Sequence, residues 1–405
     1  MADSPDRPAM ELITVPDALG EILTRARQLG PERVALASAL DRVLRADAIA
    51  DLDSPAFDAS AMDGYALRRV DTEAPLRVVG TSAAGAAFGG TVGPAECVRI
   101  FTGAPVPAGA DCVVKQEDTA RDGANVRITN IGGGPGFIRR RGENRRAGDV
   151  VVAAGTRLGP PELAALASAG LSQPLVTQRP RCAHVATGNE LVSPDQTPAG
   201  AQIRDSNSIL LASLLARQGA DLVSQIRVRD DLASAQAALA GLPAHDVLLI
   251  SGGASVGDLD FARPVLTALG YTLHFQQVNL RPGKPLVFAS RGDQLAFALP
   301  GNPVSHWVTF HLFIAPLLQK LATGIDRAPV RLRGVLAAGS PRPTADARQT
   351  IWPARASFVD GQYRLNLQPL ASSGDSSGLV GANALVPLPP NGLDPAQPVD
   401  FISCP

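Results

Sequence analysis

Segments typical of strands and of helices alternate between residues 179 and 324, and this alternation limits the possible folds more than any other feature of the sequence. The strand segments are short apolar runs, whereas the helix segments carry apolar residues at three- and four-residue spacing. We expect strands at 182–186, 222–228, 247–250, 273–275, 286–289 and 295–299, and helices at 208–217, 232–239, 261–269 and 304–321. The pattern predicts a doubly wound α/β domain that binds ligands at the carboxyl ends of its strands.

Three loops rich in glycine or proline follow strands of this domain, at residues 251–260, 281–285 and 299–305. Glycine lets backbone N–H groups approach an anion closely. Alone, a Gly-Gly turn after a buried strand is more often a plain tight turn than a ligand loop. The charged side chains on the loops include Asp258, Asp260, Arg281 and Lys284. Because such a gathering of charge calls for a ligand, we interpret the three loops as one site for a phosphate, an oxyanion and a metal.

Lysine is rare in this chain, which makes Lys284 conspicuous. Of 37 basic residues only Lys115, Lys284 and Lys320 are lysines. A lysine supplies a compact point charge that the planar guanidinium of arginine does not reproduce. We therefore interpret Lys284 as a side chain that binds an oxyanion.

Acidic residues follow two further strands of the same domain. Glu190, in a Thr-Gly-Asn-Glu turn, is either a Mg²⁺ ligand or a solvated loop acid. Asp231 is placed to cap the next helix, which leaves Asp230 for a ligand. Mg²⁺ takes one or two carboxylates together with substrate phosphates, so these acids and Asp260 suffice for a metal site.

The segments before and after this domain differ from it in their expected secondary structure. Residues 1–49 are expected to be helical, with the first helix ended by Gly30-Pro31 and with 34–44 fitting either a strand or a helix. Residues 160–170 are expected to form one further helix. Strand-like runs lie at 76–79, 98–101, 112–114 and 126–131, and again at 330–335, 362–367 and 384–388. The first group predicts a small barrel or sandwich and the second a small β-barrel. Asp63, ahead of the first group, and Thr102, within it, can each be explained by structure alone, as a turn acid and a turn hydroxyl.

Composition excludes several classes of protein. The chain is 45% hydrophobic and 19% charged with a net charge of −1, so no global field attracts nucleic acid or a membrane surface. The four cysteines form no CxxC pair and the five histidines no HxxxH pair, which excludes the usual zinc motifs; we read His184 and His274 as strand side chains. The acidic start lacks a signal peptide and no apolar run reaches membrane-spanning length, so we expect a cytoplasmic protein.

Seven motifs in order give the sequence a resemblance to a known family. The chain resembles the molybdopterin molybdenumtransferases, the MoeA and gephyrin E-domain family, from about residue 17 to 383. The motifs are Met62-Asp-Gly-Tyr-Ala66, Thr102-Gly-Ala-Pro-Val-Pro107, Arg141-Gly-Glu143, Thr187-Gly-Asn-Glu190, Ser251-Gly-Gly-Ala-Ser-Val-Gly257, Pro282-Gly-Lys-Pro285 and Leu299-Pro-Gly-Asn-Pro-Val-Ser305.

The resemblance implies a multidomain α/β plus β fold. Its parts are an elongated, discontinuous helical domain at 1–49 and 146–178, an inserted β domain at 50–145, a doubly wound molybdopterin-binding α/β domain at 179–327 and a C-terminal β-barrel at 328–405. It also implies a homodimer whose active cleft lies between the subunits.

The implied reaction consumes adenylylated molybdopterin and molybdate, and Mg²⁺-assisted cleavage of the phosphoanhydride releases AMP. The resemblance assigns catalysis to Asp63, Thr102, Glu190, Asp230, Asp260 and Lys284, with Glu190, Asp230 and Asp260 as the Mg²⁺ ligands. It assigns substrate binding to Ser251, Gly252, Gly253, Ser255, Arg281, Pro282, Gly283, Pro300, Gly301, Asn302, Ser305, Arg355 and Ser373.

Four positions depart from the family pattern. Arg281 stands where lysine is common, Gln277 where some relatives have another lysine, and Asn144 where some have an acid. Pro353 falls near a family arginine, which leaves Arg355 as its substitute.

Two other functions remain alternatives, namely a molybdopterin adenylyltransferase and a non-catalytic molybdopterin-binding scaffold. The expected protein partners are the adenylyltransferase and apo-molybdoenzymes, without nucleic acid or membrane.

Overall fold

The computed structural model describes residues 12–132, 136–229, 231–252, 262–340, 346–389 and 398–404 of the chain. The chain divides into two compact units. Unit 1 comprises residues 1–32, 41–43 and 177–405, and unit 2 comprises residues 33–40 and 44–176. The sequence predicts four domains, whereas this division gives two units. The boundaries between the four domains therefore stay a prediction. In the described part of the chain, no helix is long and apolar enough to cross a membrane.

Unit 1 is built on a mixed six-stranded sheet with the order β16-β13-β17-β21-β20-β18. Its strands are β13 (Arg181–Thr187), β16 (Asp221–Val228), β17 (Val247–Ser251), β18 (Thr272–Phe275), β20 (Val287–Arg291) and β21 (Gln294–Leu299). The first four strands in the order are parallel, and β20 runs antiparallel to both of its neighbours. The carboxyl ends of all strands except β20 therefore meet at one edge, where the predicted loops begin. The predicted doubly wound α/β fold is confirmed.

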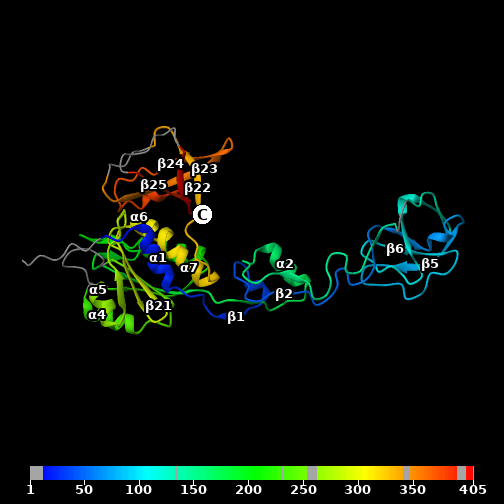
Figure 1. Ribbon diagram of the computed structural model, residues 1–405, viewed down its shortest axis with the longest axis horizontal. Coiled ribbons are helices and arrows are strands. Elements are labelled where there is room, and N and C mark those ends of the chain that lie inside the picture. Colours follow the sequence, from blue (N-terminus) through cyan, green and yellow to red (C-terminus); the bar gives the residue numbers. More distant parts are fainter. Residues whose placement is uncertain are drawn as a thin grey trace, which may run out of the picture. The chain divides into compact units, whose positions relative to one another are not determined.

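Helices cover both faces of this sheet (Figure 1). The two faces are set by alternation along the strands: Val247 and Leu249 of β17 face one hydrophobic core, and Leu248 and Ile250 face the other. The helices on the first face are α1 (Val15–Arg25), α3 (Asn207–Arg217), α6 (Pro303–Thr309) and α7 (Ala315–Thr323), and those on the second are α4 (Leu232–Ala240) and α5 (Ala262–Ala268).

The predicted helix at 304–321 is interrupted. A π-helical turn, Phe310–Ile314, separates α6 from α7, and the Ala315 N–H reaches back to the Phe310 carbonyl. Pro316 follows at once and has no N–H to offer the preceding turn, which explains why regular helical bonding breaks there.

The C-terminal part of unit 1 is a closed five-stranded barrel, as predicted. Its strands follow one another around the barrel in the order β23-β24-β22-β26-β25, and β25 pairs again with β23. They are β22 (Arg331–Leu336), β23 (Gln349–Val359), β24 (Gln362–Leu367), β25 (Ala384–Leu388) and β26 (Pro398–Ser403). A short strand, β19 (Leu280–Arg281), joins the barrel from the α/β sheet by pairing with β23.

Unit 2 contains a second six-stranded sheet, in the order β7-β4-β6-β5-β9-β8. Its strands are β4 (Gly64–Leu67), β5 (Leu76–Ser82), β6 (Glu96–Ile100), β7 (Cys112–Lys115), β8 (Thr119–Asp122) and β9 (Asn125–Ile128). A separate small core joins α2 (Pro160–Ser168) to β2 (Ala48–Ile49) and β11 (Val150–Val152), through Leu166, Ala48 and Val152.

Residues 26–49 contain no α-helix, contrary to the largely helical expectation for 1–49. The predicted helix ends with α1 at Arg25, and after Gly30 the chain forms only β1 (Pro31–Arg33), a 3₁₀ turn (Leu36–Ser38) and β2. Pro31 cannot continue a helix, and pairing of β2 with β11 supplies the backbone bonds instead. The remaining short strands are β3 (Ala59–Ser60), β10 (Ile138–Arg139), β12 (Leu175–Thr177), β14 (Leu191–Val192) and β15 (Ile203–Arg204).

Candidate active site

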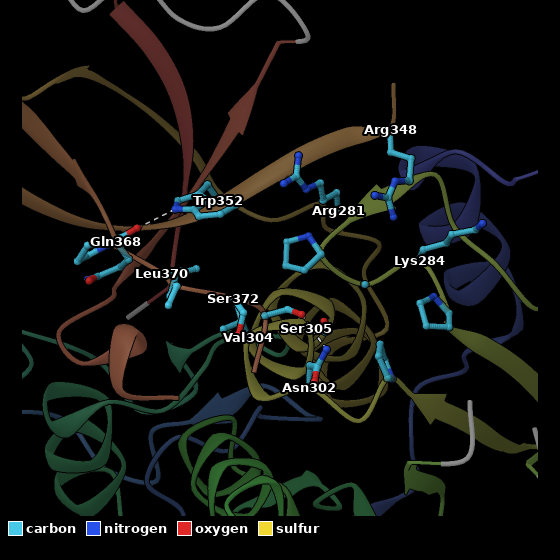
Figure 2. Close-up of a pocket in the computed structure, with 17 residues that line it drawn as sticks. Arg281, Lys284, Asn302, Val304, Ser305, Arg348, Trp352, Gln368, Leu370 and Ser372 are labelled. Carbon is cyan, nitrogen blue, oxygen red and sulfur yellow. Dashed lines mark hydrogen bonds between the residues drawn. The ribbon is translucent and has the colours of Figure 1, made fainter. Parts of the chain in front are cut away.

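A cavity of about 560 Å³ in unit 1 brings together two of the three predicted loops and one end of the barrel. In Figure 2 the side chains of Arg281, Arg348 and Lys284 lie above those of Asn302 and Ser305 at the start of α6. The lining residues are Arg281, Pro282, Gly283, Lys284, Pro285, Pro300, Asn302, Val304, Ser305, Arg348, Trp352, Gln368, Pro369, Leu370, Ala371, Ser372 and Ser373. Eight predicted substrate-binding or catalytic residues are among them: Arg281, Pro282, Gly283, Lys284, Pro300, Asn302, Ser305 and Ser373.

Two arginines meet in the cavity because β19 pairs with the start of β23. The pairing sets Arg281 beside Thr350, and Arg348 lies just before β23. Asp346 holds both guanidinium groups: its Oδ2 lies 2.7 Å from Arg348 Nη2 and 3.5 Å from Arg281 Nη1, and its Oδ1 accepts from Arg348 Nε at 2.8 Å.

This arrangement makes the cavity cationic. Hydrogen bonds from the Arg348 side chain and backbone hold the pKa of Asp346 well below its usual range, so the carboxylate remains charged. Among the described residues no carboxylate forms an ion pair with Lys284. In the part of the chain that the structure describes, Lys284, Arg281 and Arg348 line the cavity and Asp346 pairs with the two arginines. The positive charge that these side chains bring can bind an anionic ligand.

Gly283 allows the cationic loop to lie directly against α6. Its φ is +119°, and a Cβ at this position would lie 2.9 Å from Thr309 Cγ2 and 3.0 Å from Leu280 Cδ2. A side chain would push the loop away from the helix, so only glycine fits here.

The 299–305 loop is fixed by the barrel. Asn302 Nδ2 donates to Ser373 Oγ at 2.7 Å, and the Val304 N–H donates to the Ser373 carbonyl at 3.1 Å. Ser373 thus connects the barrel to the first turn of α6. Gly301 does not line the cavity, and its carbonyl accepts a hydrogen bond from Asn207 Nδ2 at 2.6 Å.

The third predicted loop begins beside the second but does not line this cavity in its described part. The Gly252 N–H donates to the Leu299 carbonyl at 3.3 Å, and the Ser251 hydroxyl is buried between two histidines. The Thr187 hydroxyl at the end of β13 is buried and finds no partner among the described residues; a Cβ on Gly252 would lie 2.7 Å from it. An unsatisfied hydroxyl at this edge fits a ligand group.

The metal site predicted around Glu190 can be described only in part. Glu190 is exposed after β13 and lies against Gly188, whose added Cβ would come within 2.7 Å of its carboxylate. The other predicted ligands, Asp230 and Asp260, lie outside the described residues, as do Gly253 and Ser255. Within the described ranges no three His, Cys, Asp or Glu side chains gather as a metal site. One exposed carboxylate at the ligand edge of the sheet suits Mg²⁺ that also binds substrate phosphates.

Arg348 and Trp352 line the cavity but were not predicted from the sequence, whereas Arg355 was predicted and does not line it. Arg355 is an exposed residue farther along β23. The pairing of β19 with β23 brings Arg348 next to Arg281. No sequence pattern indicates that these two strands pair.

Asp63 and Thr102 meet in unit 2. Asp63 Oδ1 accepts from both the Thr102 N–H and the Thr102 hydroxyl, each at 2.8 Å. These bonds, the backbone one first, lower the pKa of Asp63. Thr102 also lines a second cavity of about 440 Å³ together with Ser60, Arg139 and Asn144.

Gly64, which follows Asp63, lies where a larger residue would not fit. A Cβ on Gly64 would lie 1.9 Å from the Val114 carbonyl oxygen, across the pairing of β4 with β7. We expect Gly64→Ala to destabilise the sheet of unit 2 by roughly 3 kcal/mol, measured by hydrogen exchange in residues 64–128. Gly89→Ala is the control because no atom lies within 4 Å of its added Cβ. Equal protection in the two variants would contradict this account of Gly64.

Taken together, the fold and the cavity define a multidomain α/β protein with a cationic pocket beside the loops that leave one edge of its sheet. Two family descriptions match the chain: the MoeA N-terminal region (domain I and II) over residues 13–170, and a probable molybdopterin binding domain over residues 183–320. The chain belongs to the molybdopterin molybdenumtransferase (MoeA) family.

Individual relatives agree with this assignment. A molybdopterin molybdenumtransferase from Nostoc sp. is 36% identical over 377 residues, which cover 89% of this chain and 86% of that protein. One from Staphylococcus aureus is 29% identical over 405 residues, covering 96% and 95%. The crystal structure of a molybdopterin biosynthesis MoeA protein from Pyrococcus horikosii superimposes with a TM-score of 0.81 at 27% identity, covering 98% of this chain and all of that one.

Proposed function

We propose that this protein inserts molybdate into adenylylated molybdopterin, with Mg²⁺-dependent release of AMP. Membership of the family makes the chain a transferase of molybdenum cofactor biosynthesis that acts on a molybdopterin substrate. The proposal that molybdate is the second substrate rests on the cavity lined by Lys284, Arg281 and Arg348, in which Asp346 pairs with the two arginines.

Molybdate is a doubly charged tetrahedral oxyanion, and the cavity offers it two kinds of donor. Lys284 supplies a point charge, and Arg348 supplies a planar fork that Asp346 orients through two of its nitrogens. Donors held in place before the substrate arrives stabilise developing charge without reorganising. The residues therefore suit a step in which an oxyanion must be held beside a reacting group.

The phosphate end of the substrate would lie along the edge formed by β13 and β17. The Thr187 hydroxyl and the turn at Gly252 are placed there. Mg²⁺, held by Glu190 with Asp230 and Asp260, would neutralise charge on the phosphoanhydride. The catalytic roles of Asp63 and Thr102 that the resemblance implies remain predictions. The homodimer and the cytoplasmic location expected from the sequence, together with the proposed protein partners, remain predictions.

The adenylyltransferase alternative is not favoured. The family match begins at residue 13, and the Staphylococcus aureus relative covers 96% of the chain, so the resemblance is not confined to the α/β domain.

The proposed function is tested by incubating the protein with adenylylated molybdopterin and Mg²⁺, with and without molybdate, and measuring AMP. We expect AMP release that depends on molybdate, and recovery of an apo-molybdoenzyme at low molybdate only when this protein is present. Adenylylation of molybdopterin from ATP without molybdate would instead indicate the adenylyltransferase. Bound molybdopterin without any turnover would indicate the scaffold.

A further inference from the structure

A buried chain of hydrogen bonds runs beneath the cavity, from β16 through β13 and β17 to α6. Gln225 Nε2 lies 3.1 Å from His184 Nδ1, and His184 Nε2 lies 2.7 Å from Ser251 Oγ. Ser251 Oγ is also 2.8 Å from His306 Nε2, and His306 Nδ1 is 3.2 Å from the Asn302 carbonyl oxygen. The chain therefore ends on a residue that lines the cavity.

The direction of every bond follows from its first member. Gln225 Nε2 also lies 2.9 Å from the Ser208 carbonyl oxygen, which can only accept, so the amide NH₂ must be on that side. His184 Nδ1 therefore accepts from Gln225, and His184 Nε2–H donates to Ser251. The Ser251 hydroxyl in turn donates to His306 Nε2, and His306 Nδ1–H donates to Asn302. Each histidine is neutral and uses both of its nitrogens.

The side chains of this network are buried. His184 and His306 are fully buried, and Ser251 is 3% exposed. Burial lowers the pKa of both histidines to about 4, which keeps them neutral at pH 7. The Ser251 hydroxyl accepts one hydrogen bond and donates its only proton to His306, so it has no donor left for a ligand. This differs from the substrate-binding role that the sequence predicts for Ser251.

The far end of the network has a clear consequence for the cavity. Asn302 is held from two sides, since His306 bonds its carbonyl and Ser373 accepts from its side-chain amide. Ser305, the residue before His306, lines the same cavity. Ser251 also ends the strand from which the Gly252 turn departs.

We propose that Ser251 and His306 are positioning residues that hold the 300–305 loop in place for oxyanion binding. They act through Asn302 and contact no substrate themselves. The effect of these residues on molybdate binding rests on the proposed function. Their effect on the structure of the loop, measured by hydrogen exchange, does not.

The first test is hydrogen exchange in the protein without ligand. Ser251→Ala leaves His184 with an unmet donor and His306 with an unmet acceptor, so we expect the Val304 amide, bonded to Ser373, to exchange about tenfold faster. The matched control is Ser290→Ala, because Ser290 Oγ bonds His274 Nε2 at 2.8 Å in the same sheet but does not line the cavity. Equal exchange at Val304 in both variants would overturn the proposal.

The second test uses molybdate. Ser251→Ala should raise the KM for molybdate about tenfold while kcat changes little, and Ser251→Thr, which keeps the hydroxyl, should restore it. If the wild type turns over molybdate and Ser251→Ala has the same KM for molybdate, the positioning role is contradicted. If the wild type shows no molybdate-dependent turnover, the proposed function fails while the exchange result still decides this inference.

A third measurement covers the case in which Ser251→Ala does not fold. Nitrogen-15 NMR of the wild-type histidines should show the proton on Nε2 of His184 and on Nδ1 of His306. The opposite tautomer at either histidine would show that the chain of bonds does not run to Asn302, and would overturn the proposal.

Discussion

Lys284→Ala is expected to lower molybdate-dependent AMP release by about a hundredfold or more, because removing one preorganised charge from a site of this kind has that effect. Lys284 lines the cavity beside Arg281, and in the described structure no carboxylate neutralises it. Its side chain is half-buried at a loop rather than part of a hydrophobic core, so the variant should fold. The measurement is kcat with adenylylated molybdopterin at saturating Mg²⁺, together with circular dichroism of the variant.

The chain offers a matched control for this experiment. Lys115 is a partly exposed lysine in unit 2 that pairs with Asp118 at 3.7 Å, and Lys115→Ala should leave turnover unchanged. Lys284→Arg keeps the charge but not its compact geometry, and we expect it to recover only part of the activity. Wild-type turnover in Lys284→Ala would show that the cavity is not where the oxyanion reacts.

Phe288→Ala should destabilise unit 1 by about 3–5 kcal/mol, the usual cost of deleting a buried phenylalanine. Phe288 lies on β20, is fully buried, and its ring centroid is 5.0 Å from that of Phe297 and 5.6 Å from that of Phe275. The remaining cavity would lie beside the rings of Phe275 and Phe297.

Tryptophan fluorescence during urea unfolding measures this effect in unit 1 alone. Both tryptophans of the chain, Trp307 and Trp352, belong to that unit. The control is Phe358→Ala, because Phe358 is 65% exposed and should change the free energy of unfolding by less than about 1 kcal/mol. A loss of similar size in the two variants would contradict the core assignment.

The α/β domain was largely predictable because its strands are buried on both faces. Residues 247–250 and 295–299 are uninterrupted apolar runs, and the strands that contain them, Val247–Ser251 and Gln294–Leu299, were each predicted to within about one residue. The C-terminal barrel was predicted from three of its strands. Its longest strand, β23, was missed because Pro353 lies inside it, and a proline normally argues against a central strand.

The site was predictable where loop composition carries the signal, as for Lys284 and Asn302. Arg348 was missed because it reaches the cavity only through a tertiary strand pairing that no local pattern encodes. The histidine network was missed for the same reason: His184 and His306 are 122 positions apart in sequence, and only the sheet places Ser251 between them. Residues 1–49 were expected to be helical apart from the break at Gly30-Pro31, with 34–44 left open between strand and helix. The pairing of β2 with β11 instead decides the conformation at residues 48–49.

The central claim is that the cavity lined by Lys284, Arg281 and Arg348 binds the metal oxyanion. Anomalous scattering from molybdenum in crystals soaked with molybdate tests it most directly. We predict one strong peak within contact distance of the Lys284 ammonium and the Arg348 guanidinium. Molybdate bound only elsewhere, or an empty cavity at a concentration that saturates turnover, would contradict the account.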